Sequence, residues 1–452
     1  MMRGALGGWL WPGVSAHVPD ATLVMAERDL AGLRAHLLQA DGLERAAFGL
    51  LGRCRSVEPG EYFLHRLLLP GDGDYRRQDG ASVEPAPTYV LHTLHRLATS
   101  GAAGYLHAHS HPFSQGAAFS GTDDRFLRGE IATVRGYPRG ADVRREVPFL
   151  RLVWGQREEG FSAEVYRGDG RIVARVRELR AVGPAGIRRI VAFAAAARAS
   201  RIDDGTLPVA RLDRNIRWLG GDGQQRLREP RLAVCGAGGI GSAWVAQARG
   251  LGFRRLILID PDRVEPSNLN RLFGARLRDV GRLKVKVLAR EVRALDPTAE
   301  VEIVPAPLQS EEARRALLRA DLIVCGLDNM AARLEAQVVA ARYLKPLLDM
   351  GSGIVLRPGT RQVQHMGAQA ALYAPGGPCL LCQGVVNPSR ILSPEHRALR
   401  RGLGYVEGAE EAAPPSVVTL NALVAALGLE ALVRYLTGFG PAPTHLRYDS
   451  LA

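Results

Sequence analysis

The sequence has few cysteines and almost no lysine. Five cysteines in 452 residues are too few for a disulfide framework. Only three of the 59 basic residues are lysines, Lys284, Lys286 and Lys345, so arginine carries nearly all of the positive charge. At the few positions where this arginine-rich chain has a lysine, we expect that an arginine could not perform the same role.

Long apolar runs and dense basic runs are also missing. No window of about 18 uninterrupted apolar residues occurs, which argues against a transmembrane helix. The first 20 residues lack a clean signal-peptide cleavage site, so we expect a cytoplasmic protein. The net charge of +13 is not gathered into basic runs with interleaved aromatics, so we expect neither a nucleic-acid nor a membrane partner.

What the chain does have is an apolar content of 46%, enough for packed cores and against disorder. Residues 1–155 mix short apolar runs with helical stretches, and residues 156–206 are typical of a hairpin followed by a helix. From residue 207 a strand, a glycine loop, a helix and a strand follow one another, which indicates a parallel sheet. We therefore predict an α/β protein with domains at 1–155 and 207–452 and a hairpin and helical connector at 156–206.

The first group of chemically active residues lies between positions 44 and 123. His109 and His111 alternate along a predicted strand, so both point to one face, and Asp123 could supply an oxygen ligand. Two imidazoles and a carboxylate leave the fourth position of a zinc ion for water, as in catalytic sites. Glu44 is the candidate base for that water, and Ser120 the candidate donor to the developing oxyanion.

The sequence HSHP at 109–112, followed by SGTD at 120–123, resembles the JAB/MPN (JAMM) metalloprotease motif over roughly residues 20–155. The resemblance implies an α/β zinc isopeptidase that cleaves at the C-terminus of ubiquitin-like proteins, with Glu44 in the upstream acidic role. The segment between His111 and Ser120 is one residue longer than usual, and Asp124 competes with Asp123 as the third ligand. The alternative is an inert domain with a structural histidine pair.

The second group begins with the sequence GAGGIG at 236–241, which follows an apolar strand and opens a helix. Glycines let the backbone approach a phosphate, and the helix N-terminus favours its negative charge. Asp260, at the end of the next strand, could bind ribose in a nicotinamide enzyme as well as in an ATP enzyme. The loop consists of Gly236, Gly238, Gly239 and Gly241.

The residues that follow favour ATP over a nicotinamide cofactor. Adenylation needs cations to neutralise phosphate charge and a carboxylate to hold magnesium, whereas hydride transfer needs neither. Lys284 stands where a compact charge on phosphate is useful. The polar positions that we assign to this site are Asp262, Asn268, Arg271, Lys284, Asp328 and Asn329.

These residues resemble the ThiF/MoeB and ubiquitin-activating-enzyme superfamily over roughly residues 207–438. The resemblance implies a Rossmann-like adenylation domain that uses ATP and Mg²⁺, with Asp260 on ribose and Asp328 on magnesium. Asn268, Arg271 and Lys284 would bind the phosphates. In dimers of this superfamily the arginine at the position of Arg214 reaches the partner's ATP, so we expect a homodimer.

The cysteines match the superfamily only in part. Cys379 and Cys382 form a CxxC that resembles half of its structural zinc clip, but the second CxxC is missing. The usual thioester cysteine is absent near 408–417. Either the clip has lost zinc, or a dimer shares it, or one of the two thiols, such as that of Cys382, accepts the acyl group.

Together the motifs predict a bifunctional enzyme of the kind found in bacterial ubiquitin-like modification operons, some concerned with phage defence. A zinc isopeptidase would trim or remove a ubiquitin-like protein, and an ATP- and Mg²⁺-dependent adenylyltransferase would activate its C-terminal tail. A conjugating-enzyme-like protein is a further expected partner. The alternatives are sulfur-carrier activation for thiocarboxylate chemistry, and a nucleotide-binding regulatory protein with an inactive protease half.

Overall fold

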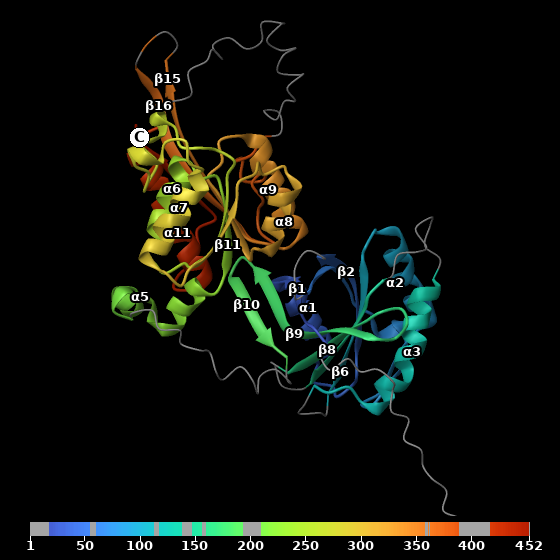
Figure 1. Ribbon diagram of the computed structural model, residues 1–452. Coiled ribbons are helices and arrows are strands. Elements are labelled where there is room, and N and C mark those ends of the chain that lie inside the picture. The colour runs from blue at the N-terminus through green and yellow to red at the C-terminus, as the bar shows by residue number, and fades with distance from the viewer. Residues whose placement is uncertain are drawn as a thin grey trace, which may run out of the picture. The chain divides into compact units, whose positions relative to one another are not determined.

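The computed structural model describes residues 18–54, 60–112, 117–137, 147–155, 160–192, 209–357, 360, 362–387 and 416–451. The chain forms two compact units. The first comprises residues 1–24, 31–180 and 189–201, and the second comprises residues 25–30, 181–188 and 202–452. Figure 1 shows the chain with its elements labelled.

The first unit is built on an eight-stranded sheet of order β1-β3-β2-β6-β7-β8-β9-β10, in which β1 also pairs with β9. β6 and β7 run parallel, whereas β2 pairs antiparallel with both β3 and β6. The strands are β1 (Asp20–Ala26), β2 (Ala46–Cys54), β3 (Gly60–Leu68), β6 (Gly104–His111), β7 (Phe149–Gly155), β8 (Phe161–Tyr166), β9 (Ile172–Gly183) and β10 (Gly186–Val191).

Two helices cover one face of this sheet. Leu94 of α2 (Pro87–Thr99) and Ile131 of α3 (Gly121–Gly136) pack with Phe48, Tyr105 and Phe149 of β2, β6 and β7 in one apolar cluster. Because β6 is covered by α3, polar side chains on this face of β6 meet those of the helix. The unit also contains α1 (Glu27–Leu37) from residue 31 on, the short helix η1 (Asp72–Asp74) and the hairpin of β4 (Tyr75–Gln78) and β5 (Val83–Pro85).

The segment after residue 155 differs from the predicted connector. β8, β9 and β10 continue the first sheet, and β8 pairs with β7 along its length. β7 is buried at every position, so it cannot be an edge strand as a boundary at 155 would require. The predicted helix begins as strand β10, and residues 193–208 lie outside the described residues.

The second unit contains a seven-stranded sheet of order β13-β12-β11-β14-β15-β16-β17. The strands from β13 to β15 are parallel, and β16 and β17 are antiparallel. This confirms the parallel α/β sheet predicted from residue 207. The strands are β11 (Arg231–Cys235), β12 (Arg255–Ile259), β13 (Glu300–Val304), β14 (Leu322–Cys325), β15 (Leu347–Leu356), β16 (Val363–Tyr373) and β17 (His445–Asp449).

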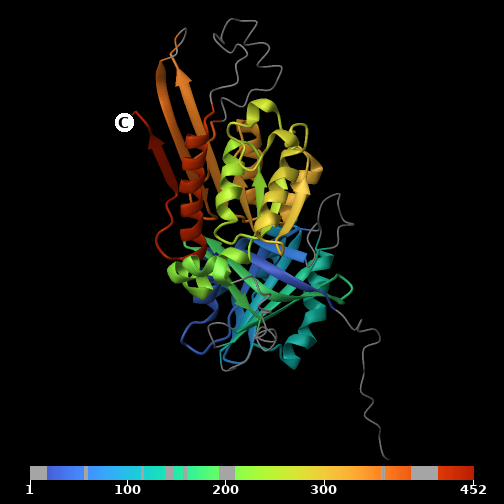
Figure 2. The same ribbon diagram turned by 60° about the vertical axis from the view of Figure 1, so that its left-hand side comes forward.

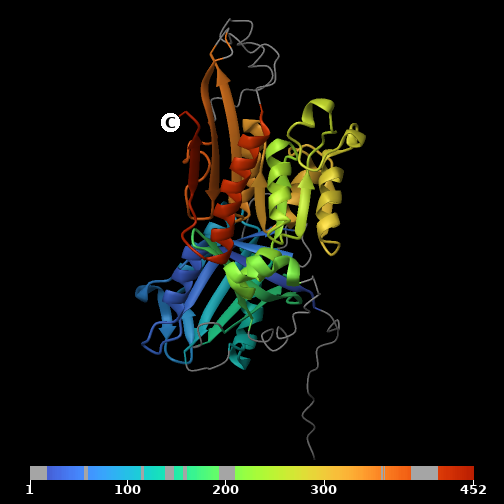
Figure 3. The same ribbon diagram turned by 90° about the vertical axis from the view of Figure 1, so that its left-hand side faces the viewer.

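Helices cover both faces of this second sheet, which explains why its central strands β11, β12 and β14 are almost continuously apolar. Leu232 and Val234 of β11 point into a cluster with α6, α7 and α11, and Ala233 and Cys235 point into one with α8 and α9. Figures 2 and 3 show the long β15–β16 pair, with α11 along one side of it. The helices are α5 (Val209–Arg228), α6 (Gly239–Ala248), α7 (Lys284–Leu295), α8 (Glu311–Arg319), α9 (Met330–Arg342) and α11 (Val418–Thr437), with the short helices η2 (Pro266–Asn268) and η3 (Leu277–Asp279).

Within the part of the chain that the structure describes, one helix, α11, is long and apolar enough to cross a membrane by length and composition. Leu420, Val424, Leu429 and Leu432 are buried against the sheet, and 56% of the helix's most apolar window is buried. The core of the second unit thus accounts for the apolar character of α11.

Candidate active sites

Three side chains that could hold a cation lie together in the first unit. His109 and His111 come from β6, and Asp123 comes from the first turn of α3. Nε2 of His109 lies 3.0 Å from Oδ1 of Asp123, and Nε2 of His111 lies 3.4 Å from its Oδ2. One ligand atom from each residue lies within 4.8 Å of the others. Two imidazoles and a carboxylate therefore face one point, as the sequence predicts for a zinc site.

The chemistry of these donors fits a zinc ion. Nε2 of His109 is buried and contacts the Asp123 carboxylate, so both groups point to the place where a metal would lie. Burial opposes ionisation of Asp123, yet the imidazoles of His109 and His111 hold the pKa of its carboxyl well below the usual range. Asp123 is thus a charged ligand at neutral pH, and the three residues match the protein ligand set of a catalytic zinc site.

The start of α3 decides which aspartate faces the histidines. Ser120 is the N-cap of the helix, since its Oγ accepts a 3.2 Å hydrogen bond from the Asp123 amide and Asp123 accepts one from the Ser120 amide. Asp124 points elsewhere and pairs with Arg151 at 2.9 Å. Asp123 is therefore the aspartate whose carboxylate faces the two histidines. The Ser120 hydroxyl keeps its hydrogen for donation.

Glu44 lies in the same cavity as the three ligands. The cavity has a volume of about 440 Å³, and its lining includes Glu44, Ser120 and the three candidate metal ligands. The pairing of Ala46 with His109 places Glu44, two residues earlier, at the His111 end of β6. Burial raises the pKa of the Glu44 carboxyl to about 7, which is the range that suits a general base.

Three polar residues beside this site were missed by the sequence analysis, the partly buried His107 and Glu130 and the buried Arg151. His107, one alternation before His109, contacts Glu130 of α3 at 3.0 Å. Arg151, opposite His107 on β7, contacts Asp124 and, at 3.0 Å, Glu164. These pairs attach α3 to the sheet and so fix the position of Asp123. The period-two run of histidines at 107, 109 and 111 was the available signal.

The second candidate site lies at the carboxyl ends of three neighbouring strands, β12, β11 and β14. The glycine loop follows β11, and its first residue, Gly236, has a φ of +92°. A Cβ on Gly241 would collide with the Gly236 carbonyl, whereas a Cβ on Gly238 would meet nothing within 4 Å. The backbone is thus closely packed at Gly241, whereas the space next to Gly238 is empty. A phosphate could lie in that space at the start of α6.

Asp260 directly follows β12 and lies beside this loop. Its Oδ2 accepts a 2.6 Å hydrogen bond from the Ala237 amide, and its Oδ1 accepts one of 2.8 Å from the Asp262 amide. Burial raises the pKa of the Asp260 carboxyl despite these bonds. Each oxygen keeps lone-pair capacity for a ribose hydroxyl, so the predicted role is compatible with the geometry.

Lys284 and Asp262 lie side by side where two chain segments pair. Nζ of Lys284 is 2.8 Å from Oδ2 of Asp262, and the Lys284 amide donates to the Asp262 carbonyl. Arg271 donates to the Ser267 carbonyl at 2.7 Å and passes close to Gly239 of the glycine loop. Asn268 uses its Oδ1 to accept from the Glu265 amide. The structure thus brings Arg271 to the loop, while Lys284 is close to Asp260.

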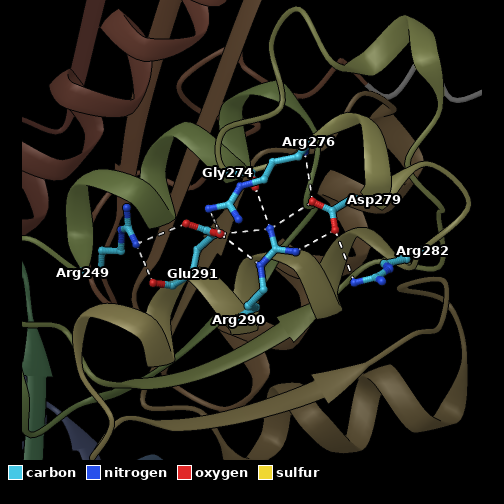
Figure 4. A network of polar contacts seen from close by, with 7 residues as sticks. All are labelled: Arg249, Gly274, Arg276, Asp279, Arg282, Arg290 and Glu291. Carbon is cyan, nitrogen blue, oxygen red and sulfur yellow. Dashed lines mark hydrogen bonds and ion pairs between the residues drawn. The ribbon is translucent and has the colours of Figure 1, made fainter.

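A network of charged side chains holds the loop between Arg271 and Lys284 (Figure 4). Asp279 is fully buried and accepts two hydrogen bonds from Arg290 of α7, at 2.7 and 3.0 Å. Arg290 also donates to the Gly274 carbonyl at 2.8 Å and lies 3.0 Å from Glu291. Because Arg290 lies on the helix that Lys284 begins, the network fixes the loop relative to Lys284.

We expect Arg290→Met to destabilise the second unit by about 3 kcal/mol, because it leaves Asp279 buried and charged without its main partner. Adding Asp279→Leu should recover most of this loss, since the unpaired charge is then removed. Arg293→Met, which removes an exposed arginine of the same helix, is the matched control. Urea denaturation of the three variants measures the difference, and equal stability of Arg290→Met and Arg293→Met would contradict the assignment.

Asp328 follows β14 at the edge of the same site. It is exposed, and Asn329 caps α9 by accepting a 2.8 Å hydrogen bond from the Ala332 amide. Arg333 of α9 donates twice to the Leu327 carbonyl and pairs with buried Asp349 at 3.1 Å. Arg333 thus fixes the loop that carries Asp328, whose exposed carboxylate accepts only a long, 3.4 Å hydrogen bond from Nδ2 of Asn329 among the described residues and could bind a cation.

The remaining predicted residues are less closely connected to this site. Arg214 is exposed on α5, so its role in a second copy's site stays a prediction. Sγ of Cys379 and Sγ of Cys382 are 3.5 Å apart, and no metal-binding group of three or more side chains includes them among the described residues. The expected thioester region, 408–417, lies outside the described residues except for its last two positions.

The glycine loop, the carboxylate on the neighbouring strand and the lysine and arginine beside them define a nucleotide-binding α/β domain of Rossmann-like form. Residues 212–452 match the ThiF family. The chain therefore belongs to the ThiF family, as the resemblance over 207–438 predicted.

Individual relatives match a shorter part of the chain. A sulfur carrier protein adenylyltransferase of Thermus thermophilus is 34% identical over 164 residues, which cover 36% of this chain and 59% of that protein. A SAMP-activating enzyme E1 of Haloferax volcanii is 32% identical over 182 residues, which cover 39% of this chain and 63% of that protein. The chain thus spans less than two thirds of each relative's length. Escherichia coli MccB, solved with ATP, has a TM-score of 0.44 and 20% identity over 54% of this chain and 69% of its own.

Proposed function

We propose that the second unit adenylates the C-terminal carboxylate of a ubiquitin-like or sulfur-carrier protein with ATP and Mg²⁺. The observation that carries this proposal is the convergence of the glycine loop, Asp260, Lys284 and Asp328 at the carboxyl ends of three adjacent parallel strands. The two relatives' names, which refer to a sulfur carrier protein and to SAMP activation, agree with such a substrate.

In this proposal each residue acts on the charge of the reaction. The glycine-loop amides and the start of α6 receive phosphate oxygens, and Asp260 binds the ribose. When the tail carboxylate attacks the α-phosphate and pyrophosphate leaves, Lys284 and Arg271 stabilise the negative charge that develops. Asp328 would hold Mg²⁺, which neutralises further phosphate charge.

The test is ATP–pyrophosphate exchange with purified protein and candidate ubiquitin-like proteins. We expect exchange only when the carrier ends in its mature tail, and a carrier shortened by one residue is the matched control. Exchange in the absence of a carrier would contradict the proposal. Failure to detect exchange with any of the ubiquitin-like proteins encoded near this gene would also contradict it.

We further propose that the first unit is a JAB/MPN-type zinc isopeptidase acting on the same tail. Its support is the cluster of His109, His111 and Asp123 in one cavity with Glu44. A zinc ion there would supply a bound water of lowered pKa and polarise the scissile carbonyl. Glu44 would accept the proton of the attacking water and pass it to the leaving amine, and Ser120 would donate to the oxyanion.

Sulfur transfer is the second candidate for the adenylation product. It is favoured by one relative's name and by the absence of cysteine from 408–417, because adenylation suffices for thiocarboxylate chemistry. Mass spectrometry of the carrier after incubation with ATP, protein and sulfide separates the routes. If the mass of the carrier rises by the difference between one sulfur and one oxygen atom, sulfur has been transferred to it. A thiol-sensitive adduct of the carrier indicates conjugation instead. A regulatory nucleotide-binding protein would give neither.

We expect Cys379→Ser and Cys382→Ser to leave pyrophosphate exchange within about twofold of wild type, because exchange precedes any thioester. Cys382 is exposed, and Cys379 is only partly buried. A thiol-sensitive acyl adduct that disappears in only one variant would identify the acceptor cysteine. A tenfold loss of exchange in a folded variant would contradict the prediction and place the pair in the adenylation site.

A further inference from the structure

The apolar helix α11 buries one amide side chain at the nucleotide site. Asn421 is only 1% exposed and lies among the buried side chains of Leu420 and Val424. Its Oδ1 accepts a 3.0 Å hydrogen bond from Ser352 Oγ of β15, and its Nδ2 donates a 3.1 Å bond to Ser416 Oγ. Leucine would suit this position better as a helix former and as a core residue, so the amide is kept for another reason.

Asn421 reaches the glycine loop from α11, which packs beside α6 on the same face of the sheet. A Cβ on Gly239 would collide with Nδ2 of Asn421 and would lie 3.4 Å from Cδ of Arg271. The neighbouring Gly238 has open space above it. The amide nitrogen and the Arg271 side chain therefore converge on the part of the loop where a phosphate would lie.

The hydrogen-bond capacity of Asn421 is not used up. An amide nitrogen carries two N–H groups, and the bond to Ser416 takes one. Both protein partners of this amide are hydroxyls, which can donate or accept, so they tolerate either orientation of the side chain. A phosphate oxygen would select the orientation that turns the nitrogen to the loop.

We propose that Asn421 is a nucleotide-binding residue, whose Nδ2 donates a hydrogen bond to a phosphate oxygen of a nucleoside triphosphate at the Gly238–Gly239 turn. The proposal rests on ATP being the substrate of this unit. The other residues of the site come from the glycine loop and the Asp260–Lys284 region. Asn421 adds a residue from α11, the C-terminal helix. Ser352 and Ser416 then hold the amide in place without touching the nucleotide.

The test is nucleotide binding to the full chain without any carrier, measured by calorimetry or by competition with a fluorescent ATP analogue. In Asn421→Leu we expect ATP affinity to fall about tenfold, as for loss of a hydrogen bond to a charged group. Adenosine affinity should stay within twofold, since adenosine lacks the phosphate. Gln247→Leu is the matched control, because it removes a side-chain hydrogen bond from α6 to α11 but leaves Asn421 and its partners in place, and its ATP affinity should also stay within twofold.

Asn421→Asp provides a second test that keeps the shape of the side chain. It replaces the donor by a negative charge, so ATP affinity should fall further than in Asn421→Leu and adenosine affinity should again be kept. Circular dichroism checks the fold of each variant. Unchanged ATP affinity in a folded variant, an equal loss of ATP and adenosine, or unfolding of both variants would overturn the proposal. Wild-type protein that binds ATP but shows no exchange with any carrier would instead contradict adenylation and leave the Asn421 contact testable.

Discussion

Replacing Asp328 by alanine should abolish ATP–pyrophosphate exchange, with a loss of at least about a thousandfold, as for removal of a group that acts on charge in the transition state. Asp328 is exposed at the end of β14, and the Arg333–Asp349 pair holds its loop. The variant therefore removes an exposed carboxylate without disturbing the core. Magnesium would lose its protein ligand while phosphate charge is developing.

Controls separate this effect from damage to the site. Asp328→Asn keeps the shape and should recover little activity, because a neutral amide is a weak magnesium ligand. Lys284→Ala should also lose most of the exchange rate, and Lys284→Arg should recover it only in part, since a guanidinium is broader than an ammonium. Thermal melting of all variants should match wild type within a few degrees. A full-rate Asp328→Ala enzyme would contradict adenylation at this site.

In the first unit, Glu44→Gln should keep zinc and lose cleavage of a tagged ubiquitin-like precursor by about 10²–10⁴-fold, the usual size of a general-base contribution. The glutamine has nearly the same shape but cannot accept the proton of the attacking water. The wild-type rate should fall as pH drops, since protonation of Glu44 removes the base. Burial raises the pKa of this carboxyl to about 7, and a bound divalent cation would lower it from there.

His109→Ala is the comparison that separates metal binding from proton transfer. It should lose both zinc and cleavage, because it removes one of three protein ligands, whereas Glu44→Gln should lose cleavage alone. Zinc is measured by inductively coupled plasma mass spectrometry after dialysis, and cleavage by gel. Loss of zinc from Glu44→Gln would place that residue among the ligands instead, and full-speed cleavage would remove it from the mechanism. If neither protein nor wild type retains zinc, the first unit is not a metalloprotease.

Local motifs predicted the strand, the helix starts and the loop on which the structure places the residues of both candidate sites. His109, His111 and Asp123 follow the period of a strand and a capped helix start, and GAGGIG occurs between strand and helix as predicted. The choice between Asp123 and Asp124 could not be made, because it depends on where Arg151 of β7 lies. Asn421 was missed for a similar reason, since nothing close to it in the sequence relates α11 to the glycine loop.

The domain boundary predicted at residue 155 shows that hydrophobic periodicity alone does not tell where a sheet ends. A hairpin at 161–183 has the same pattern whether it links two domains or extends a sheet, and only the pairing of β8 with β7 decides the matter. The alanine- and arginine-rich stretch after 186 likewise has high helix propensity, but its first residues pair as β10. Tertiary pairing overrides local preference at such positions.

The packing of α11 against α6 has a consequence for synthesis of the protein. Gln247 of α6 donates to the carbonyl of Ala422 in α11, 175 residues further along the chain. At ribosomal rates of roughly 5–20 residues per second, α11 is therefore synthesised roughly 9–35 s after the glycine loop. During that time the apolar face of α6, with Trp244 and Val245, lacks its final cover. A nascent chain stopped before residue 418 should therefore bind a hydrophobic-surface chaperone that releases it once α11 has emerged.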